Sequence, residues 1–172
     1  MTTTTIGTVT SADGTTISYH EVGHGPGLVI LHGAMQTGDS QLELAEALSP
    51  DFTCYLPDRR GRGRSGPAGP AYGLAREVED LEALLQATGA RHVAGVSSGA
   101  IITLRTLLAR PDLGRAVVFE PPLFPDGTTP AACLPRLDRE VAEGRTAAAL
   151  VTGMRAARLG PPIFRLLPRG VL

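Results

Sequence analysis

The sequence contains no lysine, so all 16 of its positively charged side chains are arginines. This absence excludes a Schiff-base lysine, a P-loop lysine and a Ser-Lys dyad. Cysteine is scarce as well, because the two cysteines, Cys54 and Cys133, lie far apart and form no C-x-x-C pair. A zinc or redox site built on cysteine is therefore not predicted, and we expect neither a metal nor a cofactor.

The sequence also lacks a targeting pattern and any long apolar run. Residues 1–10 have no basic start followed by an apolar stretch, so no signal peptide is predicted. No uninterrupted apolar stretch is long enough to cross a membrane. The formal net charge of -1 provides no field that would attract a polyanion. We therefore expect a protein of the reducing cytoplasm that acts on a small molecule, with no membrane or nucleic-acid partner.

What the sequence does contain is an alternation of strands and helices over 172 residues, enough for one domain with a real core. Apolar runs predict strands, and apolar positions at helical spacing predict the helices between them. This alternation indicates an α/β fold, a mostly parallel sheet with helices on both faces. The strands are expected at residues 15–21, 28–31, 53–56, 92–96 and 116–119, and the helices from 39 or 40, from 74 to 88 and from 100 to 110.

The composition of the sequence changes after Pro121, where proline and glycine residues separate short stretches rich in alanine, arginine and leucine. Three of these stretches, 131–143, 146–158 and 163–167, read as helical, and none reads as a strand. We therefore expect an α/β core over residues 1–123 and an added helical segment over residues 124–172.

Residues Gly95-Val96-Ser97-Ser98-Gly99 match G-x-S-x-G between a predicted strand and a predicted helix. A strand that turns at once into a helix strains the central residue, and side chains two positions away would clash, so glycine is needed there. The turn places the Ser97 hydroxyl near a helix N-terminus, where free N–H groups favour a developing oxyanion. Ser97 is the predicted nucleophile, and the Ser98 N–H is a predicted oxyanion-hole donor.

Two further segments follow predicted strands. The first, His32-Gly33-Ala34-Met35, follows strand 28–31, and Gly33 lets its backbone turn to present the Ala34 N–H as the other oxyanion donor. The second is the loop Asp58-Arg59-Arg60-Gly61-Arg62-Gly63-Arg64-Ser65-Gly66. Together with the G-x-S-x-G turn, they resemble the α/β-hydrolase superfamily, in its broad esterase, lipase and epoxide-hydrolase-like group. That family's pattern is an HG turn, then D-x-R-G-x-G-x-S, then the nucleophile turn.

The resemblance covers residues 15–123, and the segment after them resembles the start of the family's helical cap. It implies the N-terminal, six-stranded part of a serine hydrolase that acts on an ester or similar small carbonyl compound. Ser97 would attack the carbonyl, the N–H groups of Ala34 and Ser98 would hold the oxyanion, and an acyl-enzyme would form and be hydrolysed. Because the nucleophile is serine rather than aspartate, the epoxide-hydrolase and dehalogenase branch is disfavoured.

The sequence departs from the family pattern in its acid and its base. The family orders its triad Ser, acid, His, yet all four histidines of this sequence precede Ser97, and the family's last two strands have no counterpart. Glu120, at the end of strand 116–119, is a candidate acid, because ligands and catalytic groups collect at such strand ends. Otherwise Glu120 is a partly buried carboxylate that caps nearby N–H groups.

None of the four histidines occupies the family's catalytic position. We expect His32 to be structural, with its ring under the oxyanion loop and hydrogen-bonded to backbone. The other three histidines are expected at the surface or in turns; they are His20, His24 and His92.

The arginine-rich loop has two other interpretations that the sequence disfavours. Residues 61–66 match G-x-G-x-x-G after a strand, but a dinucleotide site needs a helix to begin at once, and Pro67, Gly69 and Pro70 follow instead. RNA binding is disfavoured because no aromatic residue interleaves for base stacking. We expect ion pairs and backbone contacts to structure this loop.

Three functional hypotheses stay open at this point. The chain belongs to a serine hydrolase by resemblance, or it is an inactive fragment or binding module without the triad histidine, or another polypeptide completes it. Because nothing after residue 119 reads as a strand, we expect strand 116–119 at an apolar edge that invites self-association.

Overall fold

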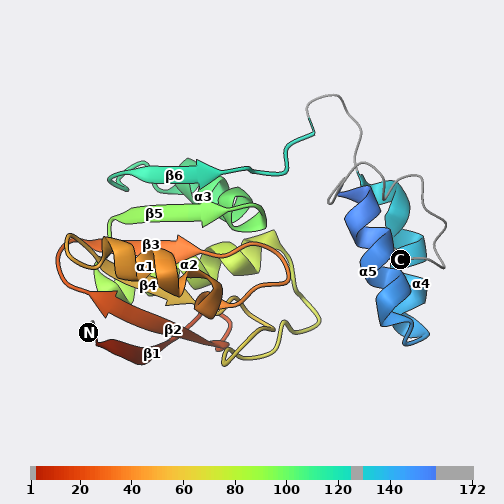
Figure 1. The fold of residues 1–172 in the computed structure, drawn as a ribbon, viewed down its shortest axis with the longest axis horizontal. Helices are drawn as coiled ribbons and strands as arrows, with labels where there is room; N and C mark the ends of the chain where they lie inside the picture. Colours follow the sequence, from red (N-terminus) through yellow and green to blue (C-terminus); the bar gives the residue numbers. More distant parts are fainter. Residues whose placement is uncertain (1–2, 125–129, 158–172) are drawn as a thin grey trace. The chain divides into compact units, whose positions relative to one another are not determined.

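The computed structural model of the protein describes residues 3–124 and 130–157. The chain divides into two compact units, Met1–Pro121 and Pro122–Leu172. The first unit carries every strand of the described chain (Figure 1).

The first unit is built on one six-stranded sheet. Its strands are β1 (Thr4–Thr10), β2 (Thr16–Gly23), β3 (Gly27–Leu31), β4 (Thr53–Pro57), β5 (His92–Val96) and β6 (Ala116–Phe119). They lie in the order β1-β2-β4-β3-β5-β6. The pairs among β4, β3, β5 and β6 are parallel, whereas β1 and β2 join antiparallel. The predicted mostly parallel sheet is confirmed.

Helices cover both faces of the sheet, as predicted. They are α1 (Leu42–Leu48), α2 (Leu74–Thr88) and α3 (Ser98–Ala109). Successive side chains of a strand point to opposite faces. Val29 and Leu31 of β3 therefore pack with α2 and α3, while Ile30 packs with α1 on the other face. This alternation makes β3 a central strand that is buried on both sides.

Two helices differ from the prediction. Asp39 and Ser40, expected to cap a helix, lie in a separate 3-10 helix, η1 (Gly38–Gln41), that precedes α1. The helix expected to be buried, α3, is only partly so, and its Leu108 is 78% exposed. One face of α3 packs on β5 and α2 and the other faces outward, so its apolar composition overstated its burial.

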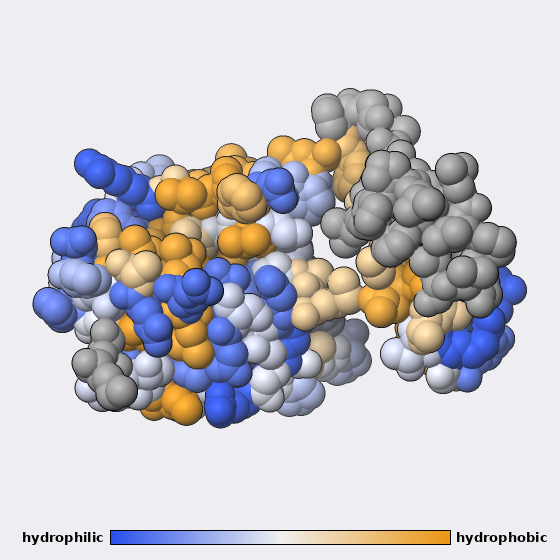
Figure 2. Space-filling view, in the orientation of Figure 1, coloured by the Kyte–Doolittle hydropathy of each residue, from blue (hydrophilic) through white to orange (hydrophobic). Residues whose placement is uncertain are grey.

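The strand β6 forms one edge of the sheet, where residues 116–119 were expected. All four of its residues are exposed, and within the described residues it pairs with β5 alone. Val117 and Phe119 are 61% and 58% exposed. Figure 2 shows hydrophobic surface along this side of the first unit. The sheet therefore ends in an apolar, uncharged strand.

The second unit consists, in its described part, of η2 (Pro130–Cys133), α4 (Leu134–Ala142) and α5 (Thr146–Ala156). The two α-helices pack side by side (Figure 1). Between them the buried carboxylate of Glu140 accepts hydrogen bonds from Arg136 Nε at 2.7 Å and Thr152 Oγ1 at 2.6 Å. The helix expected over residues 163–167 lies outside the described residues. Among the helices of residues 3–124 and 130–157, none combines the length and apolarity needed to cross a membrane.

Candidate active site

Three residues with strained backbones follow the carboxyl ends of neighbouring strands of the sheet. In the described part of the chain, the non-glycine residues with positive φ are Met35 at 57°, Ser97 at 53° and Glu120 at 47°. Each follows the carboxyl end of a parallel strand, and those strands, β3, β5 and β6, are neighbours in the sheet. Such conformations cost of the order of 1–3 kcal/mol each and gather at functional sites. The carboxyl end of these strands is therefore the candidate active site.

Ser97 occupies the turn from β5 into α3. It is the N-cap residue of α3, with φ 53° and ψ -118°, which is the strained conformation expected there. Its N–H donates to the Phe119 carbonyl at 2.9 Å, and its carbonyl accepts the Ala100 N–H at 2.9 Å. The backbone of residue 97 is thus fixed between the end of β6 and the first turn of α3.

The two glycines that flank Ser97 are required by close backbone approach. A Cβ on Gly95 would lie 2.5 Å from the Gly99 carbonyl oxygen. A Cβ on Gly99 would lie 2.5 Å from the Leu31 carbonyl oxygen and 2.7 Å from that of His32. Because these neighbours are backbone atoms, neither position has room for a side chain, which is the reason expected from the sequence.

The loop after β3 lies beside this turn. A Cβ on Gly33 would stand 3.3 Å from the Ser97 Cβ. The Gly33 N–H donates to Gln36 Oε1 at 2.8 Å, so the Gln36 side chain closes the loop. Within the described residues, no hydrogen bond engages the backbone N–H of Ala34 or Ser98. Both groups are therefore available to a ligand; their convergence on a single oxyanion stays a prediction.

His32 has the structural role that was predicted. Its ring is fully buried, with Nδ1 2.8 Å from the Gly33 carbonyl oxygen and Nε2 3.2 Å from the Arg59 backbone nitrogen. The tautomer that satisfies both contacts donates from Nδ1 and accepts at Nε2. Burial lowers the pKa of His32, which favours this neutral form.

The prediction for His20 is wrong. It is buried on β2, and its Nε2 lies 2.8 Å from Asp39 Oδ1, because this interior strand turns the side chain beneath η1. His24 is exposed in a turn, as expected. His92 begins β5, at the end opposite Ser97, and its half-buried ring accepts the Arg115 N–H at 3.1 Å.

The arginine-rich loop is structured by ion pairs and backbone contacts, as predicted. Arg59 Nε and Nη2 bind the two carboxylate oxygens of Glu77, each at 2.6 Å. Arg60 binds Asp80 in the same two-pronged way, at 2.7 and 2.6 Å. Asp58 holds the loop itself through hydrogen bonds from the N–H groups of Gly38 and Arg64.

Sequence reasoning missed the two acidic partners on α2. Glu77 and Asp80 are 4% and 7% exposed. Both lie next to the apolar stripe that predicted this helix, so their burial could have been inferred from the helical period. Buried carboxylates need cationic partners. That requirement would have pointed to the arginine-rich loop as the source of the cations.

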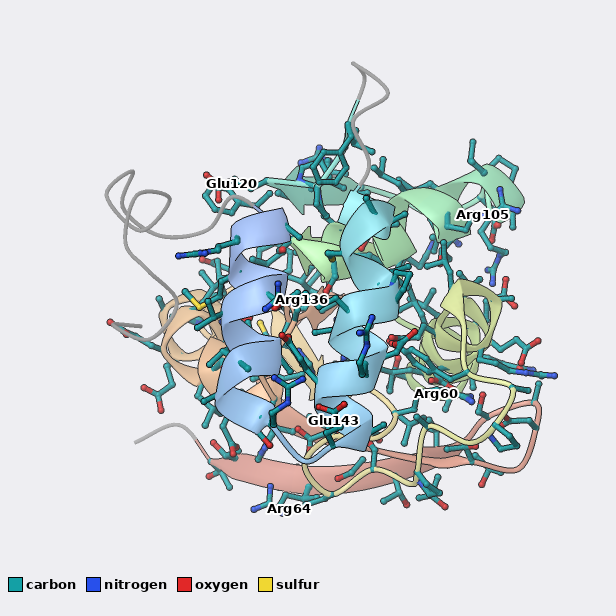
Figure 3. The ribbon with its side chains drawn as sticks, turned by 90° about the vertical axis from the view of Figure 1, so that its right-hand side faces the viewer. Arg60, Arg64, Arg105, Glu120, Arg136 and Glu143 are labelled. Carbon is teal, nitrogen blue, oxygen red and sulfur yellow. The ribbon has the colours of Figure 1, made fainter. Side chains whose placement is uncertain are left out.

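Glu120, the candidate acid, lies directly after β6. The register pairs Val96 with Phe119, so the next residues, Ser97 and Glu120, stand on adjacent strand ends. Its side chain is exposed at the end of β6 (Figure 3). This exposure contradicts the alternative of a partly buried carboxylate that caps nearby N–H groups, and the assignment of Glu120 as acid stays a prediction. No group of His, Cys, Asp or Glu among the described residues could hold a metal.

Comparison with known proteins places this geometry in a family. The model of the alpha/beta hydrolase family matches residues 28–171. The chain belongs to the α/β-hydrolase family. The solved structure of an alpha/beta hydrolase from Sphaerobacter thermophilus superposes on this chain with a TM-score of 0.82 and a sequence identity of 38%. The superposition covers 95% of this chain and 66% of the Sphaerobacter chain.

Two curated proteins are also similar to this chain. A non-heme chloroperoxidase of Streptomyces lividans is 30% identical over 71% of this chain and 50% of its own length. A pimeloyl-[acyl-carrier protein] methyl ester esterase of Xanthomonas oryzae is 32% identical over 62% of this chain and 42% of its own length. The chain thus spans half or less of the curated relatives it matches.

Proposed function

We propose that this chain carries the nucleophile and the oxyanion hole of a serine hydrolase acting on an ester or similar small carbonyl compound. The observation that carries the proposal is the strained backbone of Ser97 at the start of α3, beside the loop that presents the Ala34 N–H. Strain of this kind is kept where it serves function. The Xanthomonas relative is a methyl ester esterase, which supports an ester as the substrate class.

The proposed chemistry is acyl transfer. The Ser97 hydroxyl attacks the carbonyl carbon and loses its proton to a base, and the carbonyl oxygen takes up the negative charge. The N–H groups of Ala34 and Ser98 and the N-terminal end of α3 stabilise that oxygen. The base gives that proton to the departing alcohol; it then takes a proton from the attacking water and returns it to Ser97 as the acid is released from the acyl-enzyme. Glu120 is the proposed acid of the site.

A second candidate is a catalytically inactive fragment or binding module. The placement of the histidines favours it, because both ring nitrogens of His32 are engaged and His92 lies at the far end of β5. The two candidates share the nucleophile turn and differ in turnover. For location we propose the cytoplasm, since Cys54 and Cys133 are free thiols.

A phosphonate ester tests the proposed nucleophile without requiring turnover. Incubation with a p-nitrophenyl alkylphosphonate should leave one phosphonyl group on Ser97, because the nucleophile displaces nitrophenolate and the adduct is stable. Intact-mass and peptide mass spectrometry measure this modification. We expect none in Ser97→Ala and an unchanged rate in Ser40→Ala, since Ser40 is an exposed serine on η1. Modification spread evenly over several serines would show that Ser97 is not activated.

We also propose that the chain self-associates through β6. The carbonyls of Arg115 and Phe119 accept hydrogen bonds from the β5 side, so the N–H and C=O groups of the alternate residues, Ala116 and Val118, point outward. An apolar edge with free backbone groups is a template for pairing with another strand. Val118 is 38% exposed and carries no charge that would prevent such pairing.

Analytical ultracentrifugation at micromolar concentration measures this association. We expect the unaltered chain to sediment as dimers or larger species. Val118→Lys should raise the dissociation constant of this association about tenfold or more, because a lysine on the edge strand opposes strand pairing. Leu108→Lys is the matched control, since it adds the same charge to an exposed apolar residue of α3. A monomeric unaltered chain with cooperative unfolding would contradict the proposal.

A further inference from the structure

Arg59 contacts both segments that carry the proposed oxyanion donors, namely the loop after β3 and the first residue of α3. Its Nη1 donates to Ser98 Oγ at 2.7 Å. The same nitrogen lies 3.3 Å from the carbonyl oxygens of His32 and Gly33. One guanidinium group thereby connects the loop after β3 with the first residue of α3. The acyl-transfer chemistry described above assigns no role to this arginine.

The guanidinium is itself held rigidly. Its other edge forms the two-pronged ion pair with Glu77, and the Tyr72 hydroxyl donates to the same carboxylate at 2.6 Å. The side chains of Arg59 and Glu77 are 6% and 4% exposed. Burial raises the pKa of Glu77, but the hydrogen bonds from Arg59 and Tyr72 outweigh burial and leave that pKa below its ordinary value. The pair stays charged, and the planar fork has one orientation.

Holding the Gly33 carbonyl determines where the Ala34 N–H points. The two groups belong to the same peptide unit, and in a trans peptide they point in opposite directions. His32 Nδ1 and Arg59 Nη1 both bind the carbonyl oxygen of Gly33. The Ala34 N–H is therefore aimed away from these two groups, and a hydrogen bond on the carbonyl also polarises the N–H.

The second proposed donor, the Ser98 N–H, is positioned through the Ser98 side chain. Ser98 is the first residue of α3, and its hydroxyl accepts from Arg59, which fixes the start of the helix relative to the loop. The Ser98 N–H is the other proposed oxyanion donor. The same guanidinium thus constrains both donors, one through a carbonyl and the other through a hydroxyl.

We propose that Arg59 is a positioning residue that sets the relative aim of the Ala34 and Ser98 N–H groups, with Glu77 as its anchor. This inference rests on the proposed function, in which those two groups hold the oxyanion. It assigns to Arg59, which fills the x position of the D-x-R-G pattern, a role in the site and not only in the loop.

Two measurements on the same variants test the proposal. The first is the amide spectrum of the ¹⁵N-labelled chain. The second is the rate at which a p-nitrophenyl alkylphosphonate modifies Ser97. Arg59→Gln should shift or broaden the Ala34 and Ser98 amide signals and slow the modification about tenfold or more, since misaimed donors stabilise charge poorly. Arg59→Lys keeps the charge without the fork and should recover only part of the rate.

Arg60→Gln is the matched control. Arg60 is the next residue, is equally buried and makes the same two-pronged ion pair, but with Asp80, away from the oxyanion loop. It should lower thermal stability as Arg59→Gln does, yet leave the Ala34 and Ser98 signals and the modification rate per folded molecule unchanged. Ser98→Ala, which removes a single contact, should move the Ser98 signal and leave that of Ala34 in place.

The outcomes separate this inference from the proposed function. If Ser97 is not selectively modified in the unaltered chain, the proposed function fails, while the amide signals still decide whether Arg59 orders the two donors. If Arg59→Gln leaves both signals and the rate as they were, or if Arg60→Gln changes them equally, the positioning role is overturned. The role is supported if Arg59→Gln shifts both signals and slows the modification, while Ser98→Ala moves only the signal of residue 98 and Arg60→Gln changes neither.

Discussion

Ester hydrolysis by this 172-residue chain should be about 10⁴- to 10⁶-fold slower than that of a serine hydrolase with a complete triad. Without a general base the serine hydroxyl stays protonated and is a weak nucleophile. In the proposed function, only the two oxyanion donors, the N–H groups of Ala34 and Ser98, then accelerate the reaction. The expected result is therefore a site that reacts slowly with activated esters and does not turn over at a useful rate.

The positions of the histidines carry this prediction. The ring of His32 has both nitrogens engaged beneath the loop, and that of His20 lies against Asp39. His92 stands at the start of β5, five residues before Ser97, which is roughly 16 Å away along an extended strand. His24 lies in an exposed turn. None of the four is placed to accept the proton of the Ser97 hydroxyl.

Release of p-nitrophenol from p-nitrophenyl acetate measures this rate. The unaltered chain should barely exceed Ser97→Ala, in contrast to any intact serine esterase assayed alongside. Rapid turnover that disappears in Ser97→Ala would contradict the prediction and imply a base that the structure does not reveal. His32→Gln would then identify or exclude the nearest ring.

Replacing Arg60 with methionine should destabilise the chain by about 3–5 kcal/mol. The Arg60 side chain is 1% exposed and joins Asp80, whose side chain is 9% exposed, to Asp13 in the turn between β1 and β2. Methionine fills much of the volume but leaves the Asp80 carboxylate buried without its cation. The loss is large against the total stability of about 5–15 kcal/mol that is usual for a domain.

Urea unfolding followed by circular dichroism measures this change. Arg64→Met is the control, because Arg64 belongs to the same loop, is exposed and contributes its backbone N–H to Asp58. We expect the control to stay within about 0.5 kcal/mol of the unaltered chain. Equal midpoints for the two variants would mean that the Arg60 network adds nothing to stability.

The sequence allowed the sheet and its nucleophile turn to be predicted because both rest on local patterns. The strands gave apolar runs, and Gly95 and Gly99 are glycines because backbone atoms approach them closely. The elements around β3 to β6 could therefore be placed within a few residues. β1 carries mostly threonine and is largely exposed, so it lacked the apolar signal on which the other strands were recognised.

The parts that sequence reasoning missed depend on contacts between distant segments. Glu77 lies 18 positions after Arg59, and only the fold brings them together beneath the loop after β3. His20 was misplaced for the same reason, because its burial depends on η1, which lies over β2. The strain at Met35 and Glu120 gave no sequence signal either, since neither residue is one that commonly adopts positive φ.

A crystal structure of the chain after reaction with the p-nitrophenyl alkylphosphonate tests the central claim most directly, because it shows both the attacking atom and the groups around the developing charge. We predict a bond from phosphorus to Ser97 Oγ, with the phosphonyl oxygen about 2.7–3.1 Å from the backbone nitrogens of both Ala34 and Ser98. A phosphonyl oxygen directed away from these two N–H groups, or phosphorus attached to any other residue, would contradict the account.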